Sequence, residues 1–430
     1  MLRLLIENIL DKENKMGHWS VAKIKDFAEV KGGKRLPKGK QLIKESNSHP
    51  YIRIRDLGKT KYIQLNSDYE YVDDETQKSI ARYIVNKGDI LISVVGTIGL
   101  VGIVGDTLDK ANQTENCDKI INIKNVLPEY LYYYLISNFG QDEIRKGIVG
   151  AVQPKLPLKN VQDISIFYPS IKEQERIVNI LSSVDEKIEM NNAINNNLEQ
   201  QAQALFKKWF IDNPENVDWS AGTFRELIQS TLNGDWGKES PTGNNTEKVY
   251  CIRGADIPEV KAGNKGKMPT RYILPKNLAN KKLEAGDIVV EISGGSPTQS
   301  TGRCTAITQS LLDRYDSSMV CTNFCKAIKP KKGYSLFVYY YWQYIYEKGV
   351  FFSYENGTTG IKNLDFTGFI ETESIIVPPF DKVQVFDDYC KSIFSQIFAN
   401  GKQNEQLASL RDTLLPRLMS GELAVADIDL

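Results

Sequence analysis

The sequence has little of the residues that build metal sites and disulfide frameworks. Its only histidines are His18 and His49, and its six cysteines form no CxxC pair; they stand at 117, 251, 304, 321, 325 and 390. A structural zinc site needs closely spaced Cys and His ligands, and disulfides are rare in the cytoplasm, so we expect no metal and no disulfide. The cysteines are predicted to be small buried hydrophobes.

Sequence patterns that would indicate a membrane protein or an enzyme are also missing. No apolar run reaches the roughly 18 residues of a membrane span, and no small-residue cleavage site follows the apolar start, so we expect no membrane contact and a cytoplasmic location. There is no GxxxxGK loop followed by Ser or Thr, and GTIGLVG at 96–102 is not a dinucleotide fingerprint. VPPF at 377–380 has valine where an amino-methyltransferase motif has Asn or Asp, and no glycine-rich loop for S-adenosylmethionine accompanies it. We therefore expect no cofactor and no catalytic residues.

The first 15 residues contain Leu2, Leu5, Ile6 and Ile9, which would share one face of a short helix. We interpret this stretch as a loosely docked helix or as an extension that precedes a start at Met16, and the sequence leaves both open. Neither interpretation assigns it a function.

Most of the chain is an internal duplication, for which a length of 430 residues leaves room. HWSVAKIKDFAEV at 18–30 matches DWSAGTFRELIQS at 218–230, and YIRIRDLGK from Tyr51 matches YCIRGADIPEV from Tyr250. Further along, KGDILISVVGTIG at 87–99 matches AGDIVVEISGGSP at 285–297, and PEYLYYYLI at 128–136 matches YSLFVYYYWQY at 334–344. Because the order is kept throughout, we predict two related globular domains, each followed by a long helix.

The two long helices carry the same apolar seam. Alternating steps of four and three residues describe a heptad repeat in each, 209 residues apart. We predict an antiparallel coiled coil that pairs through Ile177, Leu181, Asn191, Asn195, Leu198, Leu205, Asn400, Asn404, Leu407 and Leu414. Centred pairing places Asn191 near Asn404 and Asn195 near Asn400, where buried amides would fix the register. The alternative, in which each helix packs on its own domain with exposed amides, stays open.

Charge is balanced overall but unevenly distributed. The chain has 54 basic and 54 acidic residues, so the total gives no indication of a polyanionic partner. Ten basic and two acidic residues lie between 31 and 61, and seven basic and no acidic residues lie between 261 and 282. One such run is more often a solvated face than a nucleic-acid site. Two runs at corresponding places of a duplicated chain favour a nucleic-acid partner.

These features together resemble the specificity (S) subunit of Type I restriction and modification systems. The phrases that carry the resemblance are GDILISVVGTIG, GDIVVEISGG, PSIKEQERIVNIL, NNLEQQAQALFKKWFID and NEQLASLRDTLLPRLMSGEL, and it covers nearly the whole chain. The resemblance implies a non-catalytic subunit that recognises a bipartite sequence in double-stranded DNA, one half per target recognition domain. It also implies partner proteins: two methyltransferase (M) subunits that dock on the chain, and restriction/translocase (R) subunits that join them.

The expected fold class is α+β, with two pseudo-repeated mixed α/β target recognition domains joined by two long helices that form an antiparallel coiled coil. We assign the first domain to residues 1–170, the central spacer helix to 171–212, the second domain to 213–380 and the C-terminal spacer helix to 381–430. About 33 paired residues would make a spacer of roughly 50 Å with the domains at opposite ends. The spacer would then set the distance between the two half-sites.

Candidate DNA contacts are assigned by side-chain chemistry. Basic residues are predicted to neutralise phosphates: Lys34, Arg35, Lys38, Lys40, Lys238, Lys261, Lys265 and Lys267. Guanidinium forks and side-chain amides are predicted to read base edges: Arg53, Arg55, Arg253, Gln153 and Gln299. Arg303 is predicted to reach either a phosphate or a base edge. The matched loops VGAVQPK and NGTTGIK add Lys155, Thr358, Thr359 and Lys362.

Two other functions stay open on the sequence alone. A two-headed protein adaptor with no nucleic-acid role would also use a helical spacer, and a catalytic role in DNA modification would need motifs that the chain lacks. The tyrosine-rich segments at 128–136 and 334–344 offer aromatic faces on which bases stack. Their helical spacing favours core packing instead.

Overall fold

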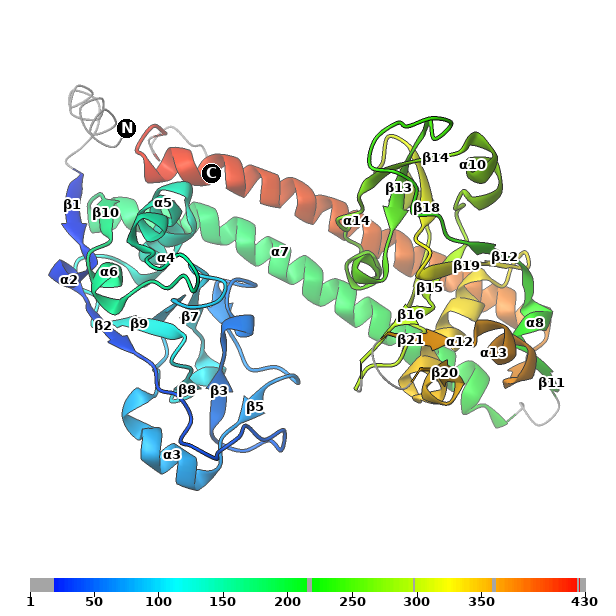
Figure 1. The fold of residues 1–430 in the computed structure, drawn as a ribbon, viewed down its shortest axis with the longest axis horizontal. Coiled ribbons are helices and arrows are strands. Elements are labelled where there is room, and N and C mark those ends of the chain that lie inside the picture. Colours follow the sequence, from blue (N-terminus) through cyan, green and yellow to red (C-terminus); the bar gives the residue numbers. More distant parts are fainter. Residues whose placement is uncertain (1–18, 215–218, 297, 358–360, 424, 426–430) are drawn as a thin grey trace. The chain divides into compact units, whose positions relative to one another are not determined.

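The computed structural model describes residues 19–214, 219–296, 298–357, 361–423 and 425. The chain forms two compact units, which are described separately: unit 1 comprises Met1–Glu186 with Ala408–Leu430, and unit 2 comprises Lys187–Leu407 (Figure 1). The expected N-terminal helix and the alternative start at Met16 lie outside the described residues. Within the described ranges, every helix is too short or too polar to cross a lipid bilayer.

Unit 1 is built on two sheets. Their strands are β2 (Glu29–Gly32), β3 (Pro50–Ile52), β4 (Tyr62–Ile63), β5 (Glu70–Tyr71), β6 (Ile90–Ser93), β7 (Val101–Val104), β8 (Asn112–Gln113) and β9 (Cys117–Ile121). The larger sheet has the order β2-β9-β6-β7-β4, and its neighbours are antiparallel except for the parallel pair β4 and β7. The smaller sheet has the order β5-β3-β8, in which β3 is antiparallel to β5 and parallel to β8.

Unit 2 repeats this topology, except that its larger sheet has four strands and, among the described residues, none at the place of β4. Its corresponding strands are β12 (Ile228–Asn233), β13 (Glu247–Ile252), β14 (Thr270–Ile273), β15 (Ile288–Glu291), β17 (Cys304–Ala306), β18 (Ser318–Cys321) and β19 (Cys325–Pro330). The sheets have the orders β12-β19-β15-β17 and β14-β13-β18, and β13 is again antiparallel to one neighbour and parallel to the other. Unit 2 adds a small sheet of β16 (Ser293–Gly294), β21 (Lys362–Leu364) and β20 (Glu355–Asn356). The predicted duplication is therefore confirmed.

A two-stranded ribbon closes each unit and leads into its long helix. In unit 1, β1 (Ser20–Lys23) pairs with β10 (Ser165–Tyr168), and α7 (Ile171–Phe206) begins directly afterwards. In unit 2, β11 (Ser220–Thr223) pairs with β22 (Ser374–Val377) and α14 (Phe380–Met419) follows. VPPF thus connects the last strand of unit 2 to α14.

One match between the two halves is off by one residue. Ile52 pairs with Gln113 as Ile252 pairs with Cys321, so Tyr51 corresponds to Cys251 rather than to Tyr250. Because side chains alternate across a strand, this shift places the two tyrosines on opposite faces. Tyr51 is accordingly buried, whereas Tyr250 is only partly buried and its hydroxyl donates to Asp316 Oδ1 at 2.7 Å.

The tyrosine-rich helices are core elements. Helix α4 (Pro128–Ile136) packs on β7, and α12 (Ser335–Glu347) packs on β17. Tyr130, Tyr133, Tyr339 and Tyr340 are all buried, and burial raises their pKa values well above the ordinary range. The predicted core packing is confirmed, and these rings are not free to stack on bases.

Within unit 2, α7 and α14 run antiparallel and share a buried layer of asparagines. Asn191 Nδ2 donates to Asn404 Oδ1 at 2.8 Å, and Asn400 Nδ2 donates to Asn195 Oδ1 at 2.8 Å. All four side chains are buried, which excludes the alternative with exposed amides. These are the two pairs that the heptad register predicts. Leu198, Leu205 and Leu407 are partly buried along the same helices.

Within unit 1, the same two helices meet again. Ile177 and Leu181 of α7 belong to one buried cluster with Leu415 and Leu418 of α14, and the partly buried Leu414 packs against it. Arg411 Nη1 lies 3.0 Å from Asp185 Oδ1. The antiparallel pairing therefore recurs in both units, and the expected fold class is confirmed. The spacer length and the placement of the domains at its ends stay predictions.

The cysteines lie where the sequence predicts them, whereas one residue of the basic run at 31–61 does not. All six cysteines are buried, as predicted. Lys61, however, is not part of a solvated face: it is 5% exposed, and its ammonium donates to Ser182 Oγ of α7 at 2.7 Å. A charge count along the sequence could not reveal this, because Ser182 lies far from Lys61 in the chain.

Candidate nucleic-acid interface

The loop that follows β2 presents exposed cations in unit 1. A side-chain carbon at Gly33 would lie 2.0 Å from the Thr114 carbonyl oxygen, so only glycine lets the loop pass this close to the end of β8. The Tyr51 hydroxyl then donates to the Lys34 carbonyl at 3.2 Å. Beyond this anchor, the side chains of Lys34 and Lys38 are exposed. These two lysines are available to an external anion.

Other cations of this run have acidic partners that lie outside it. Arg35 Nε lies 2.7 Å from Glu115 Oε1, and the Lys40 ammonium contacts both Asp73 and Glu75. The Glu70 carboxylate lies between Arg53 and Arg55 and forms ion pairs with both. The excess of positive charge is therefore smaller on the folded surface than along the sequence.

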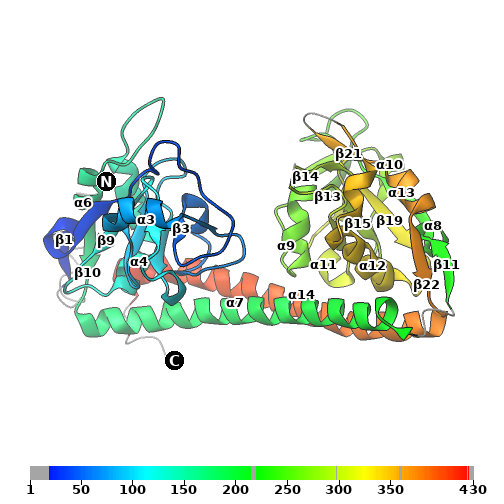
Figure 2. The same ribbon diagram turned by 90° about the horizontal axis from the view of Figure 1, so that it is seen from below.

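Gln153 and Lys155 lie on a hairpin that leaves the end of the main sheet. Val149 and Lys155 exchange two backbone hydrogen bonds of 2.9 Å, and the Leu156 amide donates to the Val94 carbonyl just after β6. The turn begins at Gly150, whose φ of +91° favours glycine. Gln153 is exposed near the tip, and Val152 beside it is 94% exposed. In Figure 2 this teal loop rises from the side of unit 1 opposite α7.

Two arginines predicted to read bases in unit 2 are held by buried carboxylates. The Arg253 fork donates to both Asp256 oxygens, at 2.9 and 3.1 Å, and also to the Lys267 carbonyl. The Arg303 fork donates to both Glu291 oxygens, at 2.8 and 2.7 Å. These hydrogen bonds raise the pKa of each guanidinium. Each arginine is held in an ion pair that fixes the position of its guanidinium, so any contact with a base must use the N–H groups that the pair leaves over.

The remaining lysines of unit 2 are in different environments. Lys238 and Lys267 are exposed. The Lys265 ammonium lies 4.7 Å from the Tyr315 ring centre, whereas Lys261 contacts Glu199 of α7 and Gln343 of α12. Lys261 is therefore the member of this run that has internal partners from two helices.

Gln299 and Lys362 lie near the small sheet of unit 2, Gln299 in the turn after β16 and Lys362 at the start of β21. Gln299 is exposed in a turn closed by its backbone contacts to Ser296. Next to it, Thr301 donates to Glu355, and the same carboxylate accepts from the Lys362 ammonium at 2.7 Å. Thr358 and Thr359 lie outside the described residues.

The structure thus groups some predicted residues and separates others. Around Glu291 it assembles the Arg303 fork and the Arg253 turn, since a side-chain carbon at Gly254 would lie 2.3 Å from Glu291 Oε1. What sequence reasoning missed is the acidic side of each pair and the exposed apolar tip at Val152. The pattern GAVQPK could have predicted this exposed tip, because its two apolar residues stand between a glycine typical of turns and a polar glutamine.

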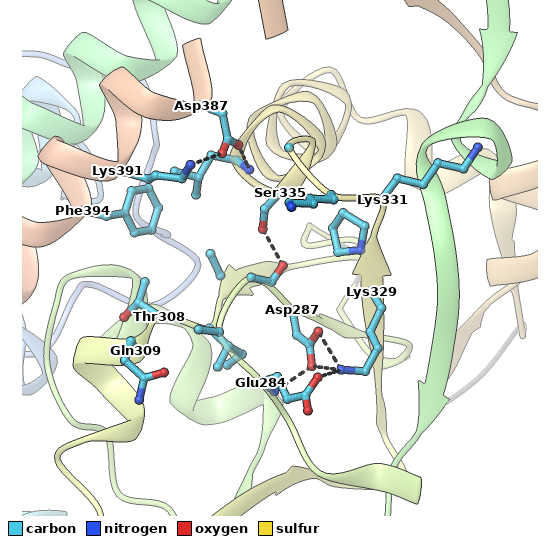
Figure 3. Close-up of a pocket in the computed structure, with 18 of the residues that line it drawn as sticks. Glu284, Asp287, Thr308, Gln309, Lys329, Lys331, Ser335, Asp387, Lys391 and Phe394 are labelled. Carbon is cyan, nitrogen blue, oxygen red and sulfur yellow. Dashed lines mark hydrogen bonds and ion pairs between the residues drawn. The ribbon is translucent and has the colours of Figure 1, made fainter. Parts of the chain in front are cut away.

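A pocket of about 650 Å³ in unit 2 lies apart from all the predicted DNA contacts (Figure 3). Several of its charges are mutually paired: Lys329 bonds to Glu284 and Asp287, and Lys391 bonds to Asp387. Asp387 also accepts from the Leu336 amide in the first turn of α12 at 2.7 Å. Among the described residues, no group of three His, Cys, Asp or Glu side chains is placed to hold a metal ion.

Comparison with known proteins finds relatives that match nearly the whole length of the chain. Residues 16–200 match the family described as Type I restriction modification DNA specificity domain. The chain is 28% identical to the Type I restriction enzyme MjaIX specificity subunit of Methanocaldococcus jannaschii, over 95% of this chain and 94% of that protein. It is 23% identical to the HindI specificity subunit of Haemophilus influenzae, over 88% of this chain and 95% of that protein.

A solved structure has the same fold. The S subunit of a Type I restriction-modification system from M. genitalium aligns with a TM-score of 0.54 and 16% identity, over 94% of this chain and 97% of that chain. The alignment spans both units, and the likeness concerns the fold alone.

Proposed function

Because this chain belongs to the specificity-subunit family of Type I restriction-modification systems, we propose that unit 1 and unit 2 each recognise one half of a bipartite sequence in double-stranded DNA. The observation that supports this most directly is the duplicated topology, since two related domains provide two related reading surfaces. The chain is the DNA-recognition subunit of its complex, and its family membership favours this role over that of a protein adaptor.

The partners follow from the same assignment. The chain works within a restriction-modification complex: we propose that two M subunits dock on it, that R subunits join them, and that these partners carry the catalytic chemistry. The target recognition domains would be residues 1–170 and 213–380, and the helices at 171–212 and 381–430 would set the distance between the half-sites. The buried asparagine pairs support a fixed helix register, which such a spacer requires. A cytoplasmic location goes with this role.

The exposed side chains are the best candidates for contact with DNA. Lys34, Lys38, Lys238 and Lys267 would contact phosphates. Gln153 and Gln299 would read base edges, since a side-chain amide forms two hydrogen bonds with adenine. Eight other predicted residues already form internal ion pairs, which reduces the positive charge that they offer to DNA: Arg35, Lys40, Arg53, Arg55, Arg253, Lys261, Arg303 and Lys362.

The decisive experiment is to assemble the chain with its M subunits and expose random DNA to the complex. Sequencing of methylated adenines should then reveal a motif in two specified parts separated by a gap of constant length. Methylation without sequence preference, or a motif in one uninterrupted part, would contradict the proposal.

A second experiment tests the phosphate contacts. Charge reversal at Lys34 and Lys38 should weaken binding of the complex to every DNA sequence and reduce the salt dependence of binding by about one phosphate contact per lysine. Lys124→Glu is the matched control for each single reversal, because Lys124 is exposed and lies in the turn after β9, where the Asn125 carbonyl contacts Gln174 of α7. An equal loss in the control would show that the effect is one of net charge alone.

A further inference from the structure

Unit 1 exposes an apolar patch on the hairpin that carries Gln153. Val152 is 94% exposed, Val149 is 42% exposed, and Val95, which is bridged to Lys155 of the hairpin stem, is 40% exposed. Single exposed apolar residues are ordinary, but two on one hairpin with a third on the segment bridged to it indicate a surface that contacts something.

The patch stands on a rigid stem. The paired backbones of Val149 and Lys155 close the hairpin, and the Leu156 amide ties its second leg to Val94. Valine is β-branched and has few rotamers, so Val152 loses little side-chain entropy when it is covered. The tip is therefore prepared for contact before any ligand arrives.

The surroundings of the patch favour DNA over an apolar protein surface. Between 144 and 162 the chain carries four cations and no acidic residue; Arg145 and Lys146 pair with Asp142 and Glu143 just outside this range, which leaves Lys155 and Lys159 as the cations of the hairpin region. Lys155 and Lys159 are exposed, and so is Gln153. An apolar tip among positive charges and an amide matches the major groove, where the thymine 5-methyl group is an apolar feature between phosphate chains.

We propose that Val152 contacts the 5-methyl group of a thymine in the half-site that unit 1 reads. Gln153, the next residue, is then placed to bond the adenine of the same or the neighbouring base pair. Val152 is a specificity-determining residue, and the half-site contains at least one A·T pair. This inference rests on the proposed DNA-recognition function and adds one base feature to it.

Exposed apolar residues also flank the matching hairpin of unit 2. Phe352 is 45% exposed under the Lys362 ammonium, which lies 5.1 Å from its ring centre, and Ile361 is 63% exposed. The proposal is restricted to unit 1, since the residue that matches Val152 in place is Thr359, outside the described part of the chain.

The test replaces each thymidine of the bipartite site in turn by deoxyuridine, which lacks only the methyl group. Binding is measured for the assembled complex with the wild-type chain and with Val152→Ala. At one thymine, the wild-type complex should lose about three- to tenfold in affinity, the scale expected for burying one methyl group. Val152→Ala should lose a similar factor on the unmodified site and nothing further at that thymine.

Val21→Ala is the matched control, because Val21 is an exposed valine on β1, 61% exposed. It should bind like the wild type and keep the full effect of deoxyuridine. Independent, multiplicative losses from Val152→Ala and from every deoxyuridine would overturn the proposal, as would an unchanged affinity of Val152→Ala or a site without thymine. A wild-type complex that shows no bipartite specificity would instead overturn the proposed function, so the two failures are distinguishable.

Discussion

Unit 1 and unit 2 place different chemistry at the same point of the same sheet. Ser93 of β6 pairs with Cys117, and Glu291 of β15 pairs with Cys325 in the same way. The Ser93 hydroxyl accepts from the Leu100 amide at 2.8 Å, whereas Glu291 forms a two-pronged ion pair with Arg303. The comparison shows that the same strand pairing accommodates either a hydroxyl or an ion pair at this position, provided that the polar groups there have hydrogen-bond partners.

The largest expected effect follows from leaving one member of the ionic pair alone. Glu291→Gln should destabilise unit 2 by about 3–5 kcal/mol, because Arg303 would remain largely buried with an uncompensated charge. Hydrogen exchange of the β15 and β17 amides during urea denaturation measures the loss. The double variant Glu291→Ser with Arg303→Leu, which installs the pair of unit 1, should lose much less. Equal losses in both variants would show that the two units are not interchangeable here.

The two long helices also differ from each other in the middle of their pairing, which lies within unit 2. In unit 2, Asn195 Nδ2 donates to the Ala262 carbonyl at 3.1 Å, beside α9 (Ile257–Lys261). The backbone of Gly263 packs against Gly401 of α14 so closely that a side-chain carbon at Gly401 would lie 1.9 Å from the Gly263 oxygen. The heptad counterpart of Gly401 in α7 is Asn192, which is exposed.

Installing that counterpart should produce the next largest effect. Gly401→Asn should destabilise unit 2 by about 3 kcal/mol, at the upper end of what overpacking costs, because backbone rather than a flexible side chain stands in the way. Increased hydrogen exchange in 257–264 would report the displacement of this loop. Lys402→Asn, at the exposed neighbouring position, is the control. If both variants behave alike, the close approach of Gly401 and Gly263 is not needed for stability.

The features that sequence reasoning predicted correctly are those set by local periodicity. The heptad steps predicted the two asparagine pairs, and the order of matched phrases predicted a duplicated topology. The match of Tyr51 with Tyr250 was wrong because it rested on similar residues in the two strands. A shift of one residue keeps that similarity but moves the side chain to the other face of the strand.

The candidate site was less predictable, because its electrostatics depend on residues far apart in the chain. Arg35 is paired with Glu115 and Arg303 with Glu291, and neither carboxylate stands in a basic run. The exposure of Val152 likewise depends on where the hairpin leaves the sheet. The sequence identifies which side chains are cationic. Only the fold shows which of them are exposed and which form ion pairs within the protein.

A smaller effect is expected at Asp118 of β9, where unit 2 has Lys326. Burial raises the pKa of Asp118 from 3.8 to about 6. The folded state therefore binds this proton more tightly than the unfolded state, so stability should fall as pH rises from about 4 to 6 and stay low above that. Asp118→Asn should remove this slope and stabilise unit 1 by about 2 kcal/mol at pH 7. Urea denaturation at several pH values measures both effects, and an unchanged slope would contradict the assignment.

The smallest expected effect concerns Asn112 of β8, which unit 2 replaces by Val320 at the corresponding place beside β13. Asn112 is fully buried, and both polar atoms of its amide lack a hydrogen-bond partner within the described residues. A buried polar group without a partner costs free energy, and valine is smaller and apolar, so Asn112→Val should stabilise unit 1 by about 1 kcal/mol. Asn112→Asp should have the opposite sign, because it buries a charge at the same point. The urea midpoint of unit 1, followed by hydrogen exchange of the β3 amides, measures both variants. A loss of stability in Asn112→Val would mean that the amide has a bound partner such as water, and that the polar residue is a requirement of unit 1 rather than a tolerated difference from unit 2.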